Sequence, residues 1–414
     1  MRRFLICVIL CVVVWGAQHN FPHSIQPVVY VGLMLVVPLT LAGTLSGSGI
    51  PFHVIPLVLG FLASGFGIRH TEAFTAAAPL AEFAQVWVGL YLGAGFSYHR
   101  FFSKNLGVVA LVTIGATLVP AFLALFLLLD FPVAHAIRLG LLAGMSGPII
   151  TLISQPDRRE ALSLSVLVMM LGLSFWFLAD LIVRTPDLYR AVPSAIVWAV
   201  GVELIARMTR TIRTGKGGQV LFGAIVATLF VCARATQISP LFLALLTGLG
   251  VSARSGRPGH ALKGMAPLSV PLSHVVLTYF AAGLDLSGLL ELSALHWEIL
   301  GIYVAAMLIG KTAGGLSAMR YARLYVRDWL QLLPQGFVVF VLLREVFPPA
   351  MEPALLDGLT AGVVLLCGIV VPLLAAPSLF LYERMDRRRI QASLRPGASE
   401  ETKRPSSGGM ARLL

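Results

Sequence analysis

Lys311 lies within an otherwise apolar run at about residues 298–317, in the sequence Gly310-Lys311-Thr312-Ala313-Gly314-Gly315. An ammonium group near the middle of a membrane costs several kcal/mol, so a lysine at this depth is a functional candidate by default. It can serve as a fixed counter-charge, or it can release and take up a proton. The small residues around it allow neighbouring helices to approach closely.

Two other apolar runs contain helix-breaking residues near their midpoints. The run at about 138–154 holds Gly144-Met145-Ser146-Gly147-Pro148, and the run at about 328–345 holds Leu333-Pro334-Gln335-Gly336. Proline removes a backbone donor and glycine lets the chain leave helical geometry, so backbone groups become free to face an ion or water. A continuous, kinked helix is the alternative for each run. The matched positions favour two discontinuous helices and make these residues ion-site candidates: Ser146, Pro148, Pro334 and Gln335.

Asp180 is a further ionisable candidate, in the last turn of the run at about 161–183. Arg184 follows it four residues later, so the two side chains would share one face of a helix. This spacing is typical of a surface ion pair. Asp180 can therefore be either a partner of Arg184 at the surface or a residue of the ion site.

The composition indicates an integral membrane protein. Hydrophobic residues make up 57% of the 414 residues, charged residues 12%, and the mean hydropathy is +0.86. Soluble domains carry about 25% charged residues. The net charge of +12 does not indicate nucleic-acid binding, because membrane proteins carry excess Lys and Arg to fix their orientation. The four cysteines lie in apolar runs without metal-ligand spacing, and no feature indicates a cofactor or an enzyme.

The apolar runs predict an all-α, polytopic protein with about 13 to 14 transmembrane helices. Placing Arg2 and Arg3 inside concentrates basic residues in every second loop, which predicts a cytoplasmic C-terminus. The predicted spans lie at about 4–17, 28–43, 53–68, 81–98, 106–129, 138–154, 161–183, 192–207, 219–236, 240–252, 269–290, 298–317, 328–345 and 354–380.

The chain divides into three parts by this pattern. Residues 1–27 form an N-terminal helix or a signal-like segment, because two arginines precede about a dozen apolar residues. Residues 28–390 form the membrane domain. Residues 391–414 are polar and rich in Ser, Gly, Arg and Glu, which predicts a disordered cytoplasmic tail.

An internal repeat is visible within the membrane domain. Residues 56–67, Pro-Leu-Val-Leu-Gly-Phe-Leu-Ala-Ser-Gly-Phe-Gly, correspond to residues 240–250, Pro-Leu-Phe-Leu-Ala-Leu-Leu-Thr-Gly-Leu-Gly. The matched runs are seven spans apart, and an odd offset inverts the second copy in the membrane, as in many secondary transporters. We expect repeat 1 at about 53–183, linker helices at about 192–236 and repeat 2 at about 240–380.

Several motifs occur together in a characteristic order. They are residues 53–60, His-Val-Ile-Pro-Leu-Val-Leu-Gly; residues 80–83, Leu-Ala-Glu-Phe; Ser146-Gly147-Pro148; Ser239-Pro240-Leu241; Gly283-Leu284-Asp285-Leu286; Gly310-Lys311; and Leu333-Pro334-Gln335-Gly336. In this order they resemble the cation:proton antiporter superfamily, especially its bacterial sodium/proton and potassium-efflux branch. The resemblance implies a homodimer in a bacterial inner membrane, with a small cation and a proton as substrates.

One departure from that family concerns the site itself. The family carries its ion-binding carboxylate, usually Asp-Asp or Asn-Asp, midway along the helix after the first break. Residues 169–175 here read Met-Met-Leu-Gly-Leu-Ser-Phe, without an acid. Asp180 can take the place of the missing carboxylate only if the helix is shifted relative to its position in that family. Ser174 and carbonyl groups near Ser146 and Pro148 remain able to coordinate sodium or potassium.

Three functions follow from these observations. The first is exchange of sodium or potassium for protons, with Lys311 or Asp180 as the titrating group. The second is transport of an inorganic or organic anion, favoured by Lys311 and helix N-termini. The third is a membrane scaffold or sensor that transports nothing.

Overall fold

The computed structural model describes residues 53–65, 67–94, 105–145, 216–236, 239–255, 259–321 and 353–374. It also describes single positions at 32, 37, 41, 167, 168, 172, 335, 339, 340 and 343. Every element in these ranges is helical, which confirms the all-α prediction at the level of fold class. Five predicted spans lie wholly or almost wholly outside this part of the chain: 4–17, 28–43, 161–183, 192–207 and 328–345.

The described helices follow the apolar runs. They are α3 (Val54–Gly65), α4 (Glu72–Ala94), α6 (Leu106–Leu123), α7 (Val133–Gly144), α11 (Lys216–Thr236), α12 (Pro240–Ser255), α13 (Gly259–Ala282), α14 (Ser287–Leu290), α15 (Ala294–Tyr321) and α18 (Pro353–Val363). A 3₁₀ turn, η1 (Ile68–His70), joins α3 to α4. Two π-helical turns, η2 (Ala124–Leu128) and η4 (Val364–Val370), continue α6 and α18.

The predicted bounds need correction at two places. Helix α4 begins at Glu72 rather than near residue 81. The run at 269–290 is not one helix, because α13 begins at Gly259 and ends at Ala282, and α14 starts after a turn at Ser287. Asp285 stabilises the turn before α14, since its Oδ1 accepts hydrogen bonds from the Ser287 backbone N–H at 2.9 Å and hydroxyl at 2.6 Å.

The described helices have the character of a membrane protein. Three are long and apolar enough to cross a bilayer: Leu106–Leu128, Ala294–Tyr321 and Leu355–Leu374. Helix α6 and η2 expose large apolar side chains, among them Leu111, Val119 and Leu127. Exposed apolar surface of this kind suits contact with lipid tails.

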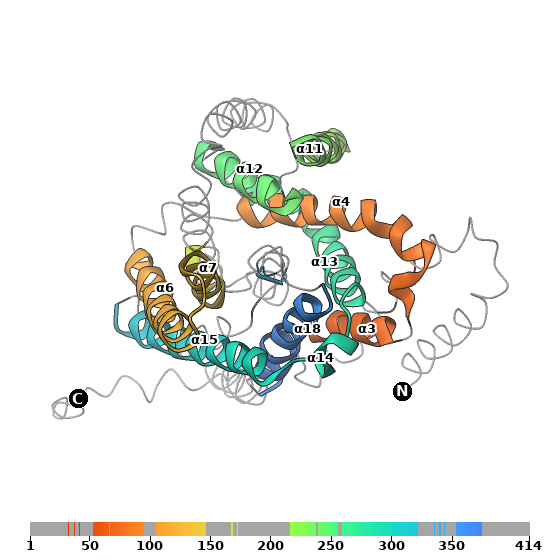
Figure 1. The fold of residues 1–414 in the computed structure, drawn as a ribbon. Helices are drawn as coiled ribbons and strands as arrows, with labels where there is room; N and C mark the ends of the chain where they lie inside the picture. The colour runs from red at the N-terminus through yellow and green to blue at the C-terminus, as the bar shows by residue number, and fades with distance from the viewer. Residues whose placement is uncertain are drawn as a thin grey trace, which may run out of the picture.

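The described helices pack in two groups (Figure 1). In the first group α4 packs on α12, α13 and α11, and α3 packs on α13. In the second group α6 packs on α15 and α7, while α18 contacts α14, α15 and η4. Helix α3 of the first group also contacts η4 of the second. The turn between α13 and α14 carries the chain from the first group to the second.

Candidate functional site

Lys311 lies at the crossing of α6 and α15 and is completely buried. Gly310 and Gly314 face α6, where a Cβ on either residue would overlap the side chains of Thr117 and Thr113, respectively. The two glycines therefore allow the helices to cross closely, as small residues do in membrane proteins. This close crossing fixes where the Lys311 side chain lies relative to α6 in the second group.

The two threonines of α6 are hydrogen-bonded within their own helix. Thr113 Oγ1 donates to the Val109 carbonyl and Thr117 Oγ1 to the Thr113 carbonyl, both at 2.7 Å. Each hydroxyl therefore already donates its proton to a carbonyl of α6. On another side, the Cys367 thiol of η4 lies close enough to Lys311 to interact with it electrostatically.

Gln335 forms a buried bridge between helices of the second group. Its Nε2 donates to the carbonyl oxygens of Leu142 and Ala143, each at 3.1 Å, and its Oε1 accepts from the Tyr303 hydroxyl at 2.9 Å. Gln335 is 0% exposed and Tyr303 is 2% exposed. We call this arrangement the amide bridge.

The amide bridge satisfies carbonyls that α7 leaves free. This helix ends at Gly144, so its last carbonyls have no intrahelical partners of the regular kind. The Met145 N–H bonds the Leu142 carbonyl at 3.1 Å, and Gln335 Nε2 donates to the Leu142 and Ala143 carbonyls. A residue from the second predicted break thus contacts the helix end at the first predicted break.

The structure places two of the seven sequence-predicted candidates. Lys311 and Gln335 are both buried in the second group, and Tyr303 of α15 connects Gln335 to the helix that carries Lys311. The other five lie outside the described residues, so their roles stay predictions: Ser146, Pro148, Ser174, Asp180 and Pro334. Discontinuous helices and the inverted repeat also stay predictions, although α7 ends where the first break is expected.

Sequence reasoning did not identify Tyr303 or the carbonyls of Leu142 and Ala143. Tyr303 precedes Lys311 by eight residues, about two helical turns, which was a usable signal. The carbonyls carry no sequence signal of their own. Arg138, a buried cationic residue of α7, also escapes sequence reasoning because it stands at the edge of the predicted apolar run.

A second polar cluster lies where α3 contacts η4. His53, just before α3, and His274 of α13 are 4% and 0% exposed, and their rings interact electrostatically. Neither ring nitrogen of His53 has a hydrogen-bond partner of good geometry among the described residues, although the Gly368 backbone lies beside the ring. The cluster lies at the contact between the two helix groups.

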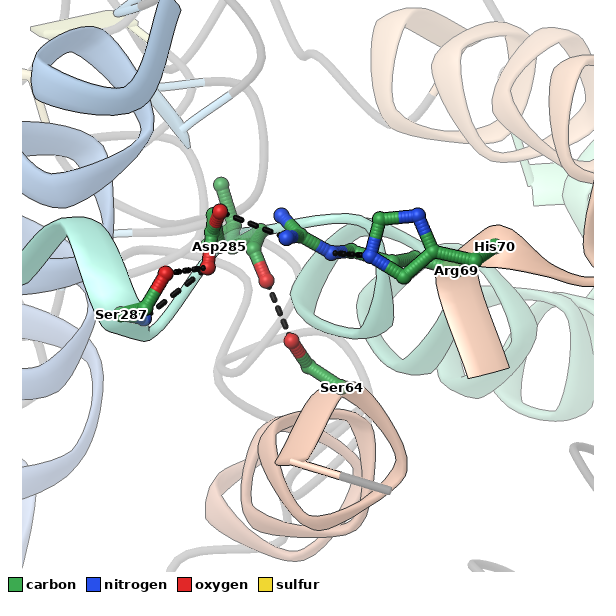
Figure 2. Close-up of polar contacts among 6 residues, drawn as sticks. Ser64, Arg69, His70, Asp285 and Ser287 are labelled. Carbon is green, nitrogen blue, oxygen red and sulfur yellow. Dashed lines mark hydrogen bonds and ion pairs between the residues drawn. The ribbon is translucent and has the colours of Figure 1, made fainter. Parts of the chain in front are cut away.

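A third cluster fixes the turn between α13 and α14 (Figure 2). Arg69 Nη2 pairs with Asp285 Oδ2 at 2.5 Å, and Arg69 Nε donates to His70 Nε2 at 2.8 Å. The buried Ser64 hydroxyl donates to the Leu284 carbonyl. Burial alone would raise the pKa of the Asp285 carboxyl, but hydrogen bonds from Ser287 and Arg69 and the charge of Arg69 outweigh it and lower that pKa.

The chain shares its overall fold with a solved membrane antiporter. Among solved structures, the chain is similar to that of the sodium proton antiporter MjNhaP1 from Methanocaldococcus jannaschii at pH 8. The TM-score is 0.62 and the identity 14%, covering 86% of this chain and 99% of that chain. No protein-family model matches the chain, and no curated protein matches it either. The likeness confirms that the chain has the fold of that antiporter.

Proposed function

We propose that the protein is a secondary active transporter that exchanges a monovalent cation, sodium or potassium, for protons by alternating access. The observation that carries this proposal is the complete burial of Lys311 in the second helix group of an antiporter-type fold. A buried ammonium is costly and persists in a membrane protein where a charge is needed. The fold alone would not carry the proposal, because one fold supports many functions.

Lys311 supplies the competition that exchange requires. While its amine holds a proton, the ammonium repels a cation entering the second group. When the proton leaves, that repulsion ends and one cation can take its place. One positive charge thus replaces another, and no buried carboxylate is needed for the competition. Asp180 remains the alternative titrating group.

The test is proton flux in inside-out vesicles from cells that lack their own exchangers. Addition of sodium, potassium or lithium salts of one anion should dissipate a proton gradient in a saturable, pH-dependent way. Lys311→Ala and the volume-preserving Lys311→Met should abolish the response. Arg320→Ala is the matched control, because it removes an exposed positive charge from the same helix and should leave the flux unchanged.

The outcomes separate the candidate groups. Wild-type flux in both Lys311 variants would exclude Lys311 from the mechanism. Loss of flux in Asp180→Asn, with Lys311 variants active, would transfer the titrating role to Asp180. We also propose that the protein is a homodimer in the inner membrane, with its C-terminus in the cytoplasm, and that the vesicle assay measures this form.

Anion transport is the second candidate, and one observation favours it. Within the described ranges the buried charged residues are Lys311 and Arg138, both cationic, and no Asp or Glu is buried there. Two buried cationic residues in the second helix group would attract an anion. Under this alternative, vesicles show no response to any cation, whereas radiolabelled organic anions accumulate and Lys311→Met stops their uptake.

A further inference from the structure

We propose that the amide bridge is a closed binding site for a dehydrated monovalent cation, built from neutral oxygens. Its ligands are the carbonyl oxygens of Leu142 and Ala143 and the Gln335 side-chain oxygen, and the Tyr303 hydroxyl holds the other end of the Gln335 amide. This inference rests on the proposed function and deepens it, because it names the groups that hold the cation in a chain that lacks the expected carboxylate.

The hydrogen-bond network determines how the Gln335 amide is oriented. The carbonyls of Leu142 and Ala143 can only accept, so the group that faces them must be the NH₂ of Gln335. Its Oε1 therefore faces Tyr303, whose hydroxyl must donate. The observed orientation is the one in which every contact pairs a donor with an acceptor.

In this orientation the amide nitrogen occupies a cation's place. The NH₂ group, whose hydrogens carry partial positive charge, lies between two backbone carbonyl oxygens, with its nitrogen 3.1 Å from each. Rings of carbonyl oxygens are the groups that replace the hydration shell of monovalent cations in ion channels. The end of α7 adds the negative end of a helix dipole to these carbonyls.

Rotation of the amide converts the closed site into a cation site. Turning the terminal torsion of Gln335 by about half a turn brings Oε1 beside the two carbonyls and Nε2 beside Tyr303; this torsion is broad in energy. The Tyr303 hydroxyl can change from donor to acceptor, because a phenol does both. The two carbonyl oxygens and Gln335 Oε1 then face one point where a cation can bind, while the Tyr303 hydroxyl accepts a hydrogen bond from Nε2.

The site is connected to Lys311 through the same elements. Tyr303 and Lys311 both belong to α15, and the Cys367 thiol of η4 interacts electrostatically with both. A cation held by neutral oxygens adds a full positive charge to the helix group that also contains Lys311. Proton release from Lys311 should therefore accompany cation binding, which is the coupling that antiport requires.

Equilibrium binding of radioactive sodium or rubidium to the purified full-length protein tests the site. Gln335→Leu should weaken binding at least about tenfold, because a ligand of a charged species is lost from a buried position. Gln335→Glu should restore it, since a carboxylate oxygen replaces the amide oxygen. Gln85→Leu is the control, because Gln85 lies on α4 in the other helix group.

A second measurement avoids substitutions that disturb folding. In the wild-type protein with ¹⁵N-labelled glutamine, saturating sodium or potassium should shift the side-chain NH₂ signals of one residue, and Gln335→Glu should remove that residue's signals. Choline, which cannot enter a site of this size, should leave the signals unchanged.

The outcomes also separate the site from the function. Cation binding that requires Gln335, in a protein without cation-driven proton flux, would support the site and contradict the proposed exchange. Cation-driven flux with unchanged binding in a folded Gln335→Leu would support exchange and overturn the site. Absence of any NH₂ shift at saturating cation would also overturn it.

Discussion

His53 combines nearly complete burial with ring nitrogens that lack well-formed hydrogen bonds in the described structure. A buried polar group without such bonds costs about 1–3 kcal/mol relative to an apolar group in the same space. If the ring has no role in transport, His53→Leu should raise the free energy of unfolding by about 1 kcal/mol. Thermal unfolding in detergent measures this change.

The matched substitution for His53 is His70→Leu. His70 is exposed in η1 and accepts a hydrogen bond from Arg69, so its replacement should give no gain in melting temperature. A lower melting temperature for His53→Leu than for wild type would show that the imidazole contributes a favourable interaction at the contact between α3 and η4.

Residue types show why Lys311 and Gln335 could be selected as candidates from the sequence, whereas the carbonyls that contact Gln335 could not. A lysine inside an apolar run stands out in any window of the sequence, and Gln335 adjoins a proline at a matched break. The carbonyls of Leu142 and Ala143 matter only because Gln335, far along the chain, packs against them. Such contacts depend on tertiary packing and leave no local pattern.

At the scale of elements, the crossing of α6 and α15 depends on Gly310 and Gly314. A Cβ at Gly310 would overlap the Thr117 side chain and come within 2.8 Å of its Cα, so Gly310→Ala must move α6 away from α15. Overpacking of this kind costs about 1–3 kcal/mol. We expect a lower melting temperature and a loss of transport, since the position of Lys311 changes.

Gly301 provides the control on the same helix. It is exposed, and a Cβ there meets nothing within 4 Å. Gly301→Ala should therefore stabilise α15 by up to about 1 kcal/mol through helix propensity alone. Equal melting temperatures for Gly310→Ala and Gly301→Ala would contradict the close crossing of the two helices.

Hydropathy predicted the described elements well where a helix is apolar from end to end. The run at 106–129 matches α6 and η2 because lipid-facing and buried positions are all apolar. It failed at the start of α4, where polar Glu72 and Thr75 precede the apolar part. It also failed at residues 283–286, where a turn stabilised by Asp285 interrupts an apolar run.

At the scale of the whole molecule, the turn between α13 and α14 joins the two helix groups, and movement of one group against the other must bend it. Arg69 and Asp285 fix this turn to the connection between α3 and α4, and Asp285 also holds the first residue of α14. Asp285→Asn keeps the shape but removes the charge, so it should loosen α14 and increase hydrogen exchange of its backbone amides.

The same ion pair predicts a pH dependence with a definite sign. The pKa of Asp285 is lowered in the folded protein from its ordinary value of 3.8, so the carboxylate contributes stability that is fully present above that value. This contribution is lost as the pH falls through the lower folded pKa. The difference in amide exchange between wild type and Asp285→Asn should therefore be constant at neutral and mildly acidic pH and disappear only below about pH 4. Glu291→Gln, which removes an exposed carboxylate just beyond α14, should match wild type throughout. A difference that disappears near neutral pH would show that another group, and not the Asp285 carboxylate, holds the two helix groups at this turn.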